Sequence, residues 1–156
     1  MKPDVLHRPV ALIDSGLGGL TVLSALRELM PELDAVYFAD TAHVPYGDRP
    51  LEEVASYGRQ MIDWLSALQP AAIIIASGTT CAAFEAAGWS PAGQPQLGVA
   101  TLGAAAGVAA SKTQNIGVIA TRATTESGIF ERKIHALEPA AIVTSVAAPA
   151  LVPLVE

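Results

Sequence analysis

A chain of 156 residues, of which 51% are hydrophobic and 15% charged, can form one or two small domains and is too apolar to be disordered. Its net charge of −6, with no basic cluster, argues against nucleic acid and anionic membrane surfaces as partners. The single cysteine, Cys81, excludes an internal disulfide and a cysteine-cluster metal site. Because no apolar run is as long as a membrane span and residues 1–4 lack a signal-peptide core, we expect a soluble cytoplasmic protein.

The first apolar run, residues 9–13, predicts a strand buried on both faces of a parallel sheet. It continues through Asp14, Ser15 and a glycine-rich turn into a predicted helix over residues 20–30. Two interpretations of this turn stay open. A dinucleotide-binding loop would need glycine where Thr21 stands, whereas a plain tight turn would use Asp14 only as a helix cap.

Two further apolar runs, residues 35–39 and 71–76, predict the second and third strands. The second strand is followed by Asp40, and the third by Ser77 and other small polar residues. A parallel sheet would bring these strand ends to the edge that also holds the first loop. Open α/β folds bind small molecules at that edge, so the sequence predicts a site there.

The loop over residues 41–50 is polar, rich in turn residues and long for a simple connection, which makes it a candidate binding loop. His43 in this loop could be a base or a ligand, although a lone surface histidine more often has neither role. Residues 51–68 carry an apolar stripe at helical spacing. A short helix is expected after the third strand, with Cys81 inside it.

Residues 88–96 have the composition of a linker, and the strand and helix pattern restarts beyond them. The elements that we expect there are strands over 97–100, 116–120 and 141–147, with helices over 102–112 and 121–137. The apolar end, residues 149–156, is typical of a chain interrupted within its structure. We therefore expect an α/β fold with a first lobe over 1–96 and an incomplete second lobe over 97–156.

Two long motifs resemble those of the glutamate racemase family, which belongs with the aspartate/glutamate racemases. Residues 14–22 read Asp-Ser-Gly-Leu-Gly-Gly-Leu-Thr-Val and are similar to the family's opening signature. Residues 37–47, Tyr-Phe-Ala-Asp-Thr-Ala-His-Val-Pro-Tyr-Gly, are similar to its second signature. Residues 116–130 and 151–156 fit later stretches, so the resemblance covers nearly the whole chain.

The resemblance implies parallel sheets flanked by helices in two similar lobes, with glutamate bound between them and no cofactor. It also implies interconversion of L- and D-glutamate for peptidoglycan synthesis, in which two cysteines on opposite sides of the substrate remove and return the Cα proton. In this chain Asp14 would assist the first base, and Glu156 matches an acid that the family pairs with a histidine. The substrate contacts would be Asp14, Ser15, Pro45, Tyr46, Gly47, Gly78 and Thr79.

The chain departs from the family pattern in two places. Ser77 stands where the family has its first catalytic cysteine, and the sequence stops at Glu156, before the second. A serine hydroxyl has a pKa several units above that of a thiol, so Ser77 would need a strong partner to act as a base. Cys81 lies about one helical turn, or roughly 6 Å, farther along and is expected to be a small buried hydrophobe.

Two hypotheses from different classes follow. The chain is either an amino-acid racemase that is impaired or inactive in this form, or a binding module for an acidic amino acid or a protein partner that has lost its bases. Nucleotide binding stays a remote third alternative. Lobes without their packing partners would expose apolar surface, so we expect low solubility or self-association, for example as a homodimer.

Overall fold

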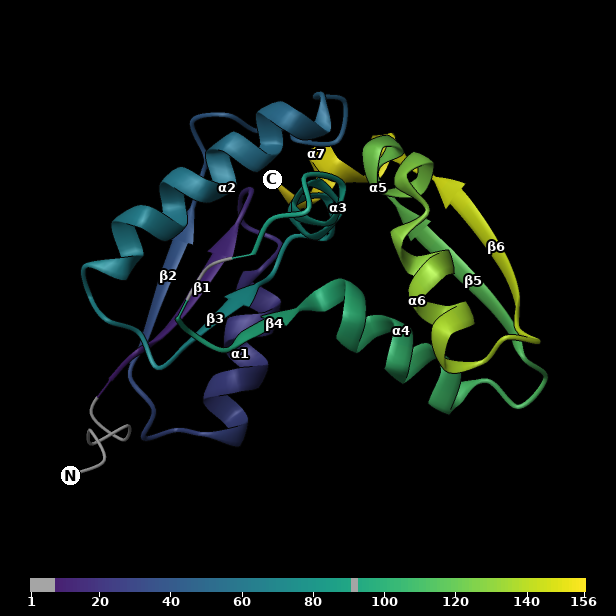
Figure 1. Ribbon diagram of the computed structural model, residues 1–156, viewed down its shortest axis with the longest axis horizontal. Helices are drawn as coiled ribbons and strands as arrows, with labels where there is room; N and C mark the ends of the chain where they lie inside the picture. The colour runs from purple at the N-terminus through teal and green to yellow at the C-terminus, as the bar shows by residue number, and fades with distance from the viewer. Residues whose placement is uncertain (1–7, 91–92) are drawn as a thin grey trace.

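The fold is that of a computed structural model, which describes residues 8–90 and 93–156 and contains two separate parallel sheets flanked by helices (Figure 1). The first sheet has the strand order β2-β1-β3-β4. Its strands are β1 (Val10–Asp14), β2 (Ala35–Ala39), β3 (Ala72–Ile75) and β4 (Gln96–Gly98). All the pairings are parallel, so the carboxyl ends of β1 and β3 lie next to each other. The sequence prediction of the first three strands is confirmed.

Helices cover both faces of the first sheet because its central strands are apolar on both sides. The helices α2 (Leu51–Ser66) and α3 (Gly78–Ala86) pack on one face, and the main hydrophobic core lies between them and the sheet. The helix α1 (Leu20–Leu29) lies on the side away from α2 and buries none of its residues (Figure 1). The first strands therefore hold the polar residues at their carboxyl ends on a rigid support.

The second sheet consists of the parallel strands β5 (Asn115–Ala120) and β6 (Ile142–Ala147). The helices α4 (Val99–Ala110) and α6 (Ile129–Leu137) pack on one of its faces around the buried Ala104 and Ile134. Beyond β6, the short helices η2 (Pro149–Leu151) and α7 (Val152–Val155) return toward the first sheet (Figure 1). The two sheets thus face a common space near the carboxyl ends of their strands.

One expectation about the second half is wrong in detail. The strand expected over 97–100 is β4, an edge strand of the first sheet, and Val99 already begins α4. The segment over 88–96, expected to separate two lobes, therefore connects α3 to β4 of the same sheet, although residues 91 and 92 lie outside the described part. The cause is backbone pairing of β4 with β3, which composition does not reveal. The division into lobes at 96/97 stays a prediction.

The single helix expected over 121–137 is divided into α5 (Arg122–Ser127) and α6. Gly128 separates them with a φ of 65°, a left-handed conformation that glycine adopts without the strain of a Cβ. Its backbone N–H closes the last turn of α5 on the carbonyl of Thr125. Among the helices of residues 8–90 and 93–156, none combines the length and the apolar character needed to cross a membrane.

Candidate functional site

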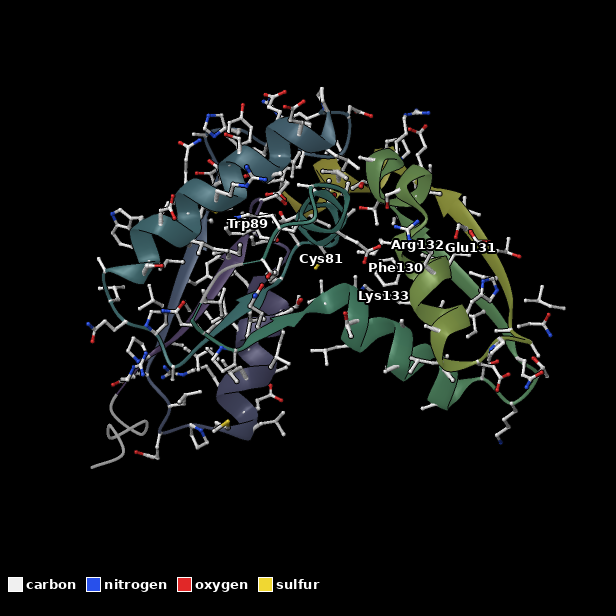
Figure 2. The ribbon with its side chains drawn as sticks, in the orientation of Figure 1. Cys81, Trp89, Phe130, Glu131, Arg132 and Lys133 are labelled. Atoms are coloured by element: carbon white, nitrogen blue, oxygen red, sulfur yellow. The ribbon has the colours of Figure 1, made fainter. Side chains whose placement is uncertain are left out.

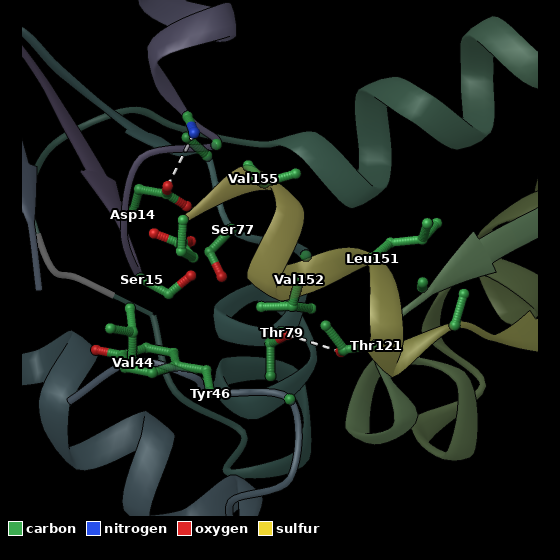
Figure 3. Close-up of a pocket in the computed structure, with 18 of the residues that line it drawn as sticks. Asp14, Ser15, Val44, Tyr46, Ser77, Thr79, Thr121, Leu151, Val152 and Val155 are labelled. Carbon is green, nitrogen blue, oxygen red and sulfur yellow. Dashed lines mark hydrogen bonds between the residues drawn. The ribbon is translucent and has the colours of Figure 1, made fainter. Parts of the chain in front are cut away.

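A cavity of about 260 Å³ lies between the two sheets, at the carboxyl ends of β1, β3, β5 and β6 (Figure 3). The predicted site residues that line it are Asp14, Ser15, Tyr46, Gly47, Ser77, Gly78, Thr79 and Glu156. Pro45 lines a smaller neighbouring cavity of about 90 Å³ that shares Gly47 with the first. The ends of β1 and β3 meet at this cavity as the sequence predicts, whereas Asp40, which follows β2, does not line it. The roles of the cavity-lining residues stay predictions.

Asp14, the last residue of β1, is almost completely buried at 4% exposure. Its Oδ2 atom accepts hydrogen bonds from the backbone N–H groups of Gly16 (3.3 Å) and Gly19 (2.8 Å) and from the hydroxyl of Tyr37 (3.0 Å). Burial and the negative charge of Asp14 raise the pKa of Tyr37, so the phenol stays protonated and remains a donor. The backbone N–H groups of the glycine-rich turn therefore bind the carboxylate of Asp14, and we call this arrangement of the turn the cradle around Asp14.

Ser77 is the N-cap of α3, and its Oγ accepts a hydrogen bond from the backbone N–H of Thr80 at 3.2 Å. The side chain lines the cavity but is only 6% exposed. Among the described residues, no lysine, arginine or histidine lines the cavity, so no basic side chain there could activate the hydroxyl. The geometry gives Ser77 the properties of a helix cap and a hydrogen-bond donor rather than of a strong base.

Cys81 does not replace the missing thiol. It is 8% exposed and lines a different cavity, together with Phe84 and Lys133, on the far side of α3 (Figure 2). Its Sγ lies 3.7 Å from the carbonyl oxygen of Ile75, and burial raises the pKa of the thiol. This placement agrees with the expectation of a small buried hydrophobe.

The loop over residues 41–49 is held by Asp40, which follows β2. The carboxylate of Asp40 accepts a hydrogen bond from the Tyr46 hydroxyl at 2.5 Å and lies 2.8 Å from Nδ1 of His43. The His43 ring stacks on Tyr57 at 4.0 Å between ring centroids and does not line the cavity. His43 is therefore not placed as a base, and Tyr46 presents its ring rather than a free hydroxyl to the cavity.

Two threonines that the sequence analysis did not single out belong to the surroundings of the cavity. Thr121, at the N-cap of α5, lines it, and Thr124 is buried behind Thr121 at 3% exposure. The Oγ1 of Thr79 lies 2.9 Å from that of Thr121 and 3.1 Å from that of Thr124. Thr121 directly follows β5, so the rule that located the other strand ends could have found it.

Glu156 directly follows α7 and lines the cavity from the C-terminal segment of the chain. Its Oε2 accepts a hydrogen bond from the backbone N–H of Leu17 at 3.0 Å, and its carboxylate lies so close to Gly16 that a Cβ there would overlap it. The cavity thus combines two acidic side chains, Asp14 and Glu156, with several hydroxyl groups. Carboxylates suit an ammonium group, whereas hydroxyl and backbone N–H groups suit the carboxylates of a ligand.

Residues 8–90 and 93–156 contain no group of three or more histidine, cysteine, aspartate or glutamate side chains that could hold a metal ion. The donors around the cavity instead fit an organic ligand that carries both charges.

Comparison with known proteins gives a consistent result, although no protein-family model matches the chain. Glutamate racemase 2 of Caldanaerobacter subterraneus subsp. tengcongensis is 40% identical over 149 residues, which cover 96% of this chain and 55% of that protein. The glutamate racemase of Picosynechococcus is 41% identical over 150 residues, covering 96% and 53%. This chain is a homologue of glutamate racemases. It spans about half the length of the curated relatives that it matches.

Solved structures of glutamate racemases share the fold. The isoform RacE1 from Bacillus anthracis superimposes with a TM-score of 0.91 at 35% identity, over 96% of this chain and 56% of that one. The glutamate racemase from Francisella tularensis, solved in complex with D-glutamate, gives a TM-score of 0.78 at 33% identity, over 88% and 52%. The resemblance noted in the two sequence motifs is thus confirmed over nearly the whole chain.

Proposed function

We propose that the cavity between the two sheets binds glutamate, and that its residues are this chain's contribution to a glutamate racemase site. The observation that carries this proposal is the set of cavity-lining groups in a homologue of glutamate racemases: the carboxylates of Asp14 and Glu156 and the hydroxyls of Ser15, Ser77, Thr79 and Thr121. A relative of the same fold was solved with D-glutamate bound. Interconversion of L- and D-glutamate is the reaction that this homology supports.

The cavity offers a complementary group for each charged group of glutamate. Its ammonium group would lie toward Asp14 and Glu156, where negative charge gathers. Its carboxylates would accept hydrogen bonds from Ser15 and Thr79, whose hydroxyl groups need no positive charge to donate. A cavity of about 260 Å³ is large enough for a small amino acid but not for a dinucleotide.

Removal of the Cα proton is the step in which this chain differs from the cysteine-based mechanism that the family resemblance implies. The thiol of a cysteine has a pKa of about 8.5, which a helix N-terminus lowers, whereas the hydroxyl of a serine is far less acidic. Ser77 also accepts the hydrogen bond that caps α3. We therefore propose that the chain racemises glutamate very slowly or not at all as it stands. The cap geometry favours the second candidate function, binding of an acidic amino acid without turnover.

The test is to incubate D- and L-glutamate separately with the chain in D2O and to follow loss of the Cα proton by NMR. We expect saturable binding with little exchange in the unmodified chain. Ser77→Cys should exchange at least one enantiomer faster, because α3 begins at this position and favours a thiolate. Ser77→Ala, which removes the cap without adding a thiol, is the matched control.

Three results would contradict the proposal. Absence of binding for both enantiomers would refute a glutamate site. Rapid exchange by the unmodified chain would refute the argument about Ser77, and equal exchange by Ser77→Cys and Ser77→Ala would refute the position of the base.

A further inference from the structure

Three threonine hydroxyls meet where the two sheets face each other at the edge of the cavity. Thr79 belongs to α3, which packs on the first sheet, whereas Thr121 and Thr124 belong to the segment that follows β5 of the second sheet. The Oγ1 atoms are 2.9 Å apart for Thr79 and Thr121, 3.1 Å for Thr79 and Thr124, and 2.9 Å for Thr121 and Thr124. Figure 3 shows the first of these contacts. We call this group the hydroxyl triangle.

The hydroxyl triangle uses all of its protons internally. Three hydroxyls carry three protons, and three oxygen–oxygen contacts require one donor each. Thr121 donates to Thr124, so a closed ring follows in which Thr124 donates to Thr79 and Thr79 donates to Thr121. Thr121 also accepts a hydrogen bond from the backbone N–H of Thr124 at 3.3 Å. With the ring closed in this way, no hydroxyl proton of the ring points into the cavity.

A carboxylate that enters the cavity can accept a hydrogen bond from this ring at the loss of one of its three contacts. If the Thr79 hydroxyl turns toward the ligand, only its contact with Thr121 is broken. The bonds from Thr121 to Thr124 and from Thr124 to Thr79 remain, so both cavity-lining oxygens stay held. Without the Thr124 hydroxyl, neither of those two bonds exists, and the Thr79 hydroxyl has no partner that orients it toward the ligand.

We propose that Thr124, which does not line the cavity, is a positioning residue that holds the Thr121 hydroxyl in place and orients the Thr79 hydroxyl toward a ligand carboxylate. This inference rests on the proposed function, because it concerns how the same cavity holds an acidic amino acid. Thr124 is 3% exposed, and its side chain meets the N-terminal end of α3 as well as its own helix. Its hydroxyl therefore links the two halves of the site, because it lies within hydrogen-bond distance of both Thr79 and Thr121.

The first experiment examines the chain without ligand. Hydroxyl protons of buried threonines that are held in a ring exchange slowly with water, and NMR can detect them together with the threonine methyl groups. Thr124→Val has the same shape without the hydroxyl, and we expect it to remove the slow hydroxyl signals of Thr79 and Thr121. Thr124→Ser keeps the hydroxyl and should retain them. Thr125→Val is the matched control, because the Thr125 hydroxyl is buried without a hydrogen-bond partner.

The second experiment titrates the same variants with D- and L-glutamate. Thr124→Val should weaken binding about fivefold, the fold-change that corresponds to one net hydrogen bond, while Thr124→Ser and Thr125→Val bind like the unmodified chain. In a cycle with Thr79→Val, the double variant should bind no more weakly than Thr79→Val alone, because Thr124 acts through Thr79.

The outcomes separate this inference from the proposed function. Unchanged Thr79 and Thr121 signals in Thr124→Val would overturn the positioning role, and so would unchanged glutamate affinity in a chain that binds glutamate. If the unmodified chain binds no glutamate, the proposed function is wrong. The spectra without ligand then still decide whether Thr124 orients the other two hydroxyls.

Discussion

Substitution of Gly19 by alanine tests whether the cradle around Asp14 has room for any side chain. Gly19 has a φ of −67° and a ψ of −9°, a conformation that alanine adopts without strain. By backbone entropy alone, Gly19→Ala would stabilise the chain by about 0.4–1 kcal/mol. The added Cβ would, however, lie 2.8 Å from the Cβ of Ala76, and 2.9 Å from both Cγ of Asp14 and the Tyr37 hydroxyl.

These contacts decide the sign of the effect. Ala76 and Asp14 are short side chains at the ends of β3 and β1, so neither can rotate away. Overpacking of this kind costs about 1–3 kcal/mol, which exceeds the entropic gain. We expect Gly19→Ala to lower the free energy of unfolding by about 1–2 kcal/mol and the melting temperature by roughly 2–8 °C. The displaced carboxylate should also weaken glutamate binding.

Gly18→Ala is the matched control one residue earlier. Its Cβ would meet Val155 at 3.6 Å and the Asp14 carboxylate at 4.0 Å, which are ordinary contacts. Urea and thermal unfolding of the two variants, followed by circular dichroism, should therefore show a loss of stability only for Gly19→Ala. Equal stability of Gly19→Ala and Gly18→Ala would refute the reasoning that the cradle is filled.

Three further predictions concern Cys81 and Glu85, two side chains of α3 that do not line the cavity. Because burial raises the pKa of Cys81, we expect its thiol to react with a disulfide reagent about tenfold more slowly in the folded chain than in the chain unfolded by urea. For the same reason the free energy of unfolding should fall as pH rises above about 8.5, and Cys81→Ala should remove that dependence. Burial raises the pKa of the Glu85 carboxyl, but hydrogen bonds from Arg132 and Lys133 on α6 outweigh this effect and hold the pKa below its usual range. Glu85→Gln should lower stability at pH 7 by at most about 1 kcal/mol, and the difference should shrink as pH falls below about 4.3 and vanish at the lower pH where the carboxyl is protonated in the folded chain as well. A pH-independent difference would contradict the ion-pair explanation.

Much of the first sheet could be predicted because its elements are local in origin. Short apolar runs without polar residues indicate strands buried on both faces, and β1, β2 and β3 lie where such runs occur. The residues directly after them, Asp14 and Ser77, meet at one cavity because parallel strands end at the same edge. Strand direction and polarity at the strand ends were sufficient for this part of the site.

The features that could not be predicted depend on contacts between distant segments. The strand β4 joins the first sheet through backbone hydrogen bonds to β3, and these bonds leave no mark in composition. Gly128 divides a segment whose apolar spacing is continuous, because its left-handed conformation changes the helix direction. The role of Thr124 depends on a hydroxyl of Thr79 that lies 45 residues earlier in the chain.

The most direct measurement of the central claim is a titration of the isotopically labelled chain with D- and L-glutamate, followed by backbone amide NMR. The account predicts saturable shifts for Ser15, Thr79 and Thr121 around the cavity. It predicts no shifts for residues such as Lys112 and Gln114, which lie in a cavity at the far end of the second sheet. Absence of saturable shifts at millimolar glutamate, or shifts confined to that far end, would contradict glutamate binding between the two sheets.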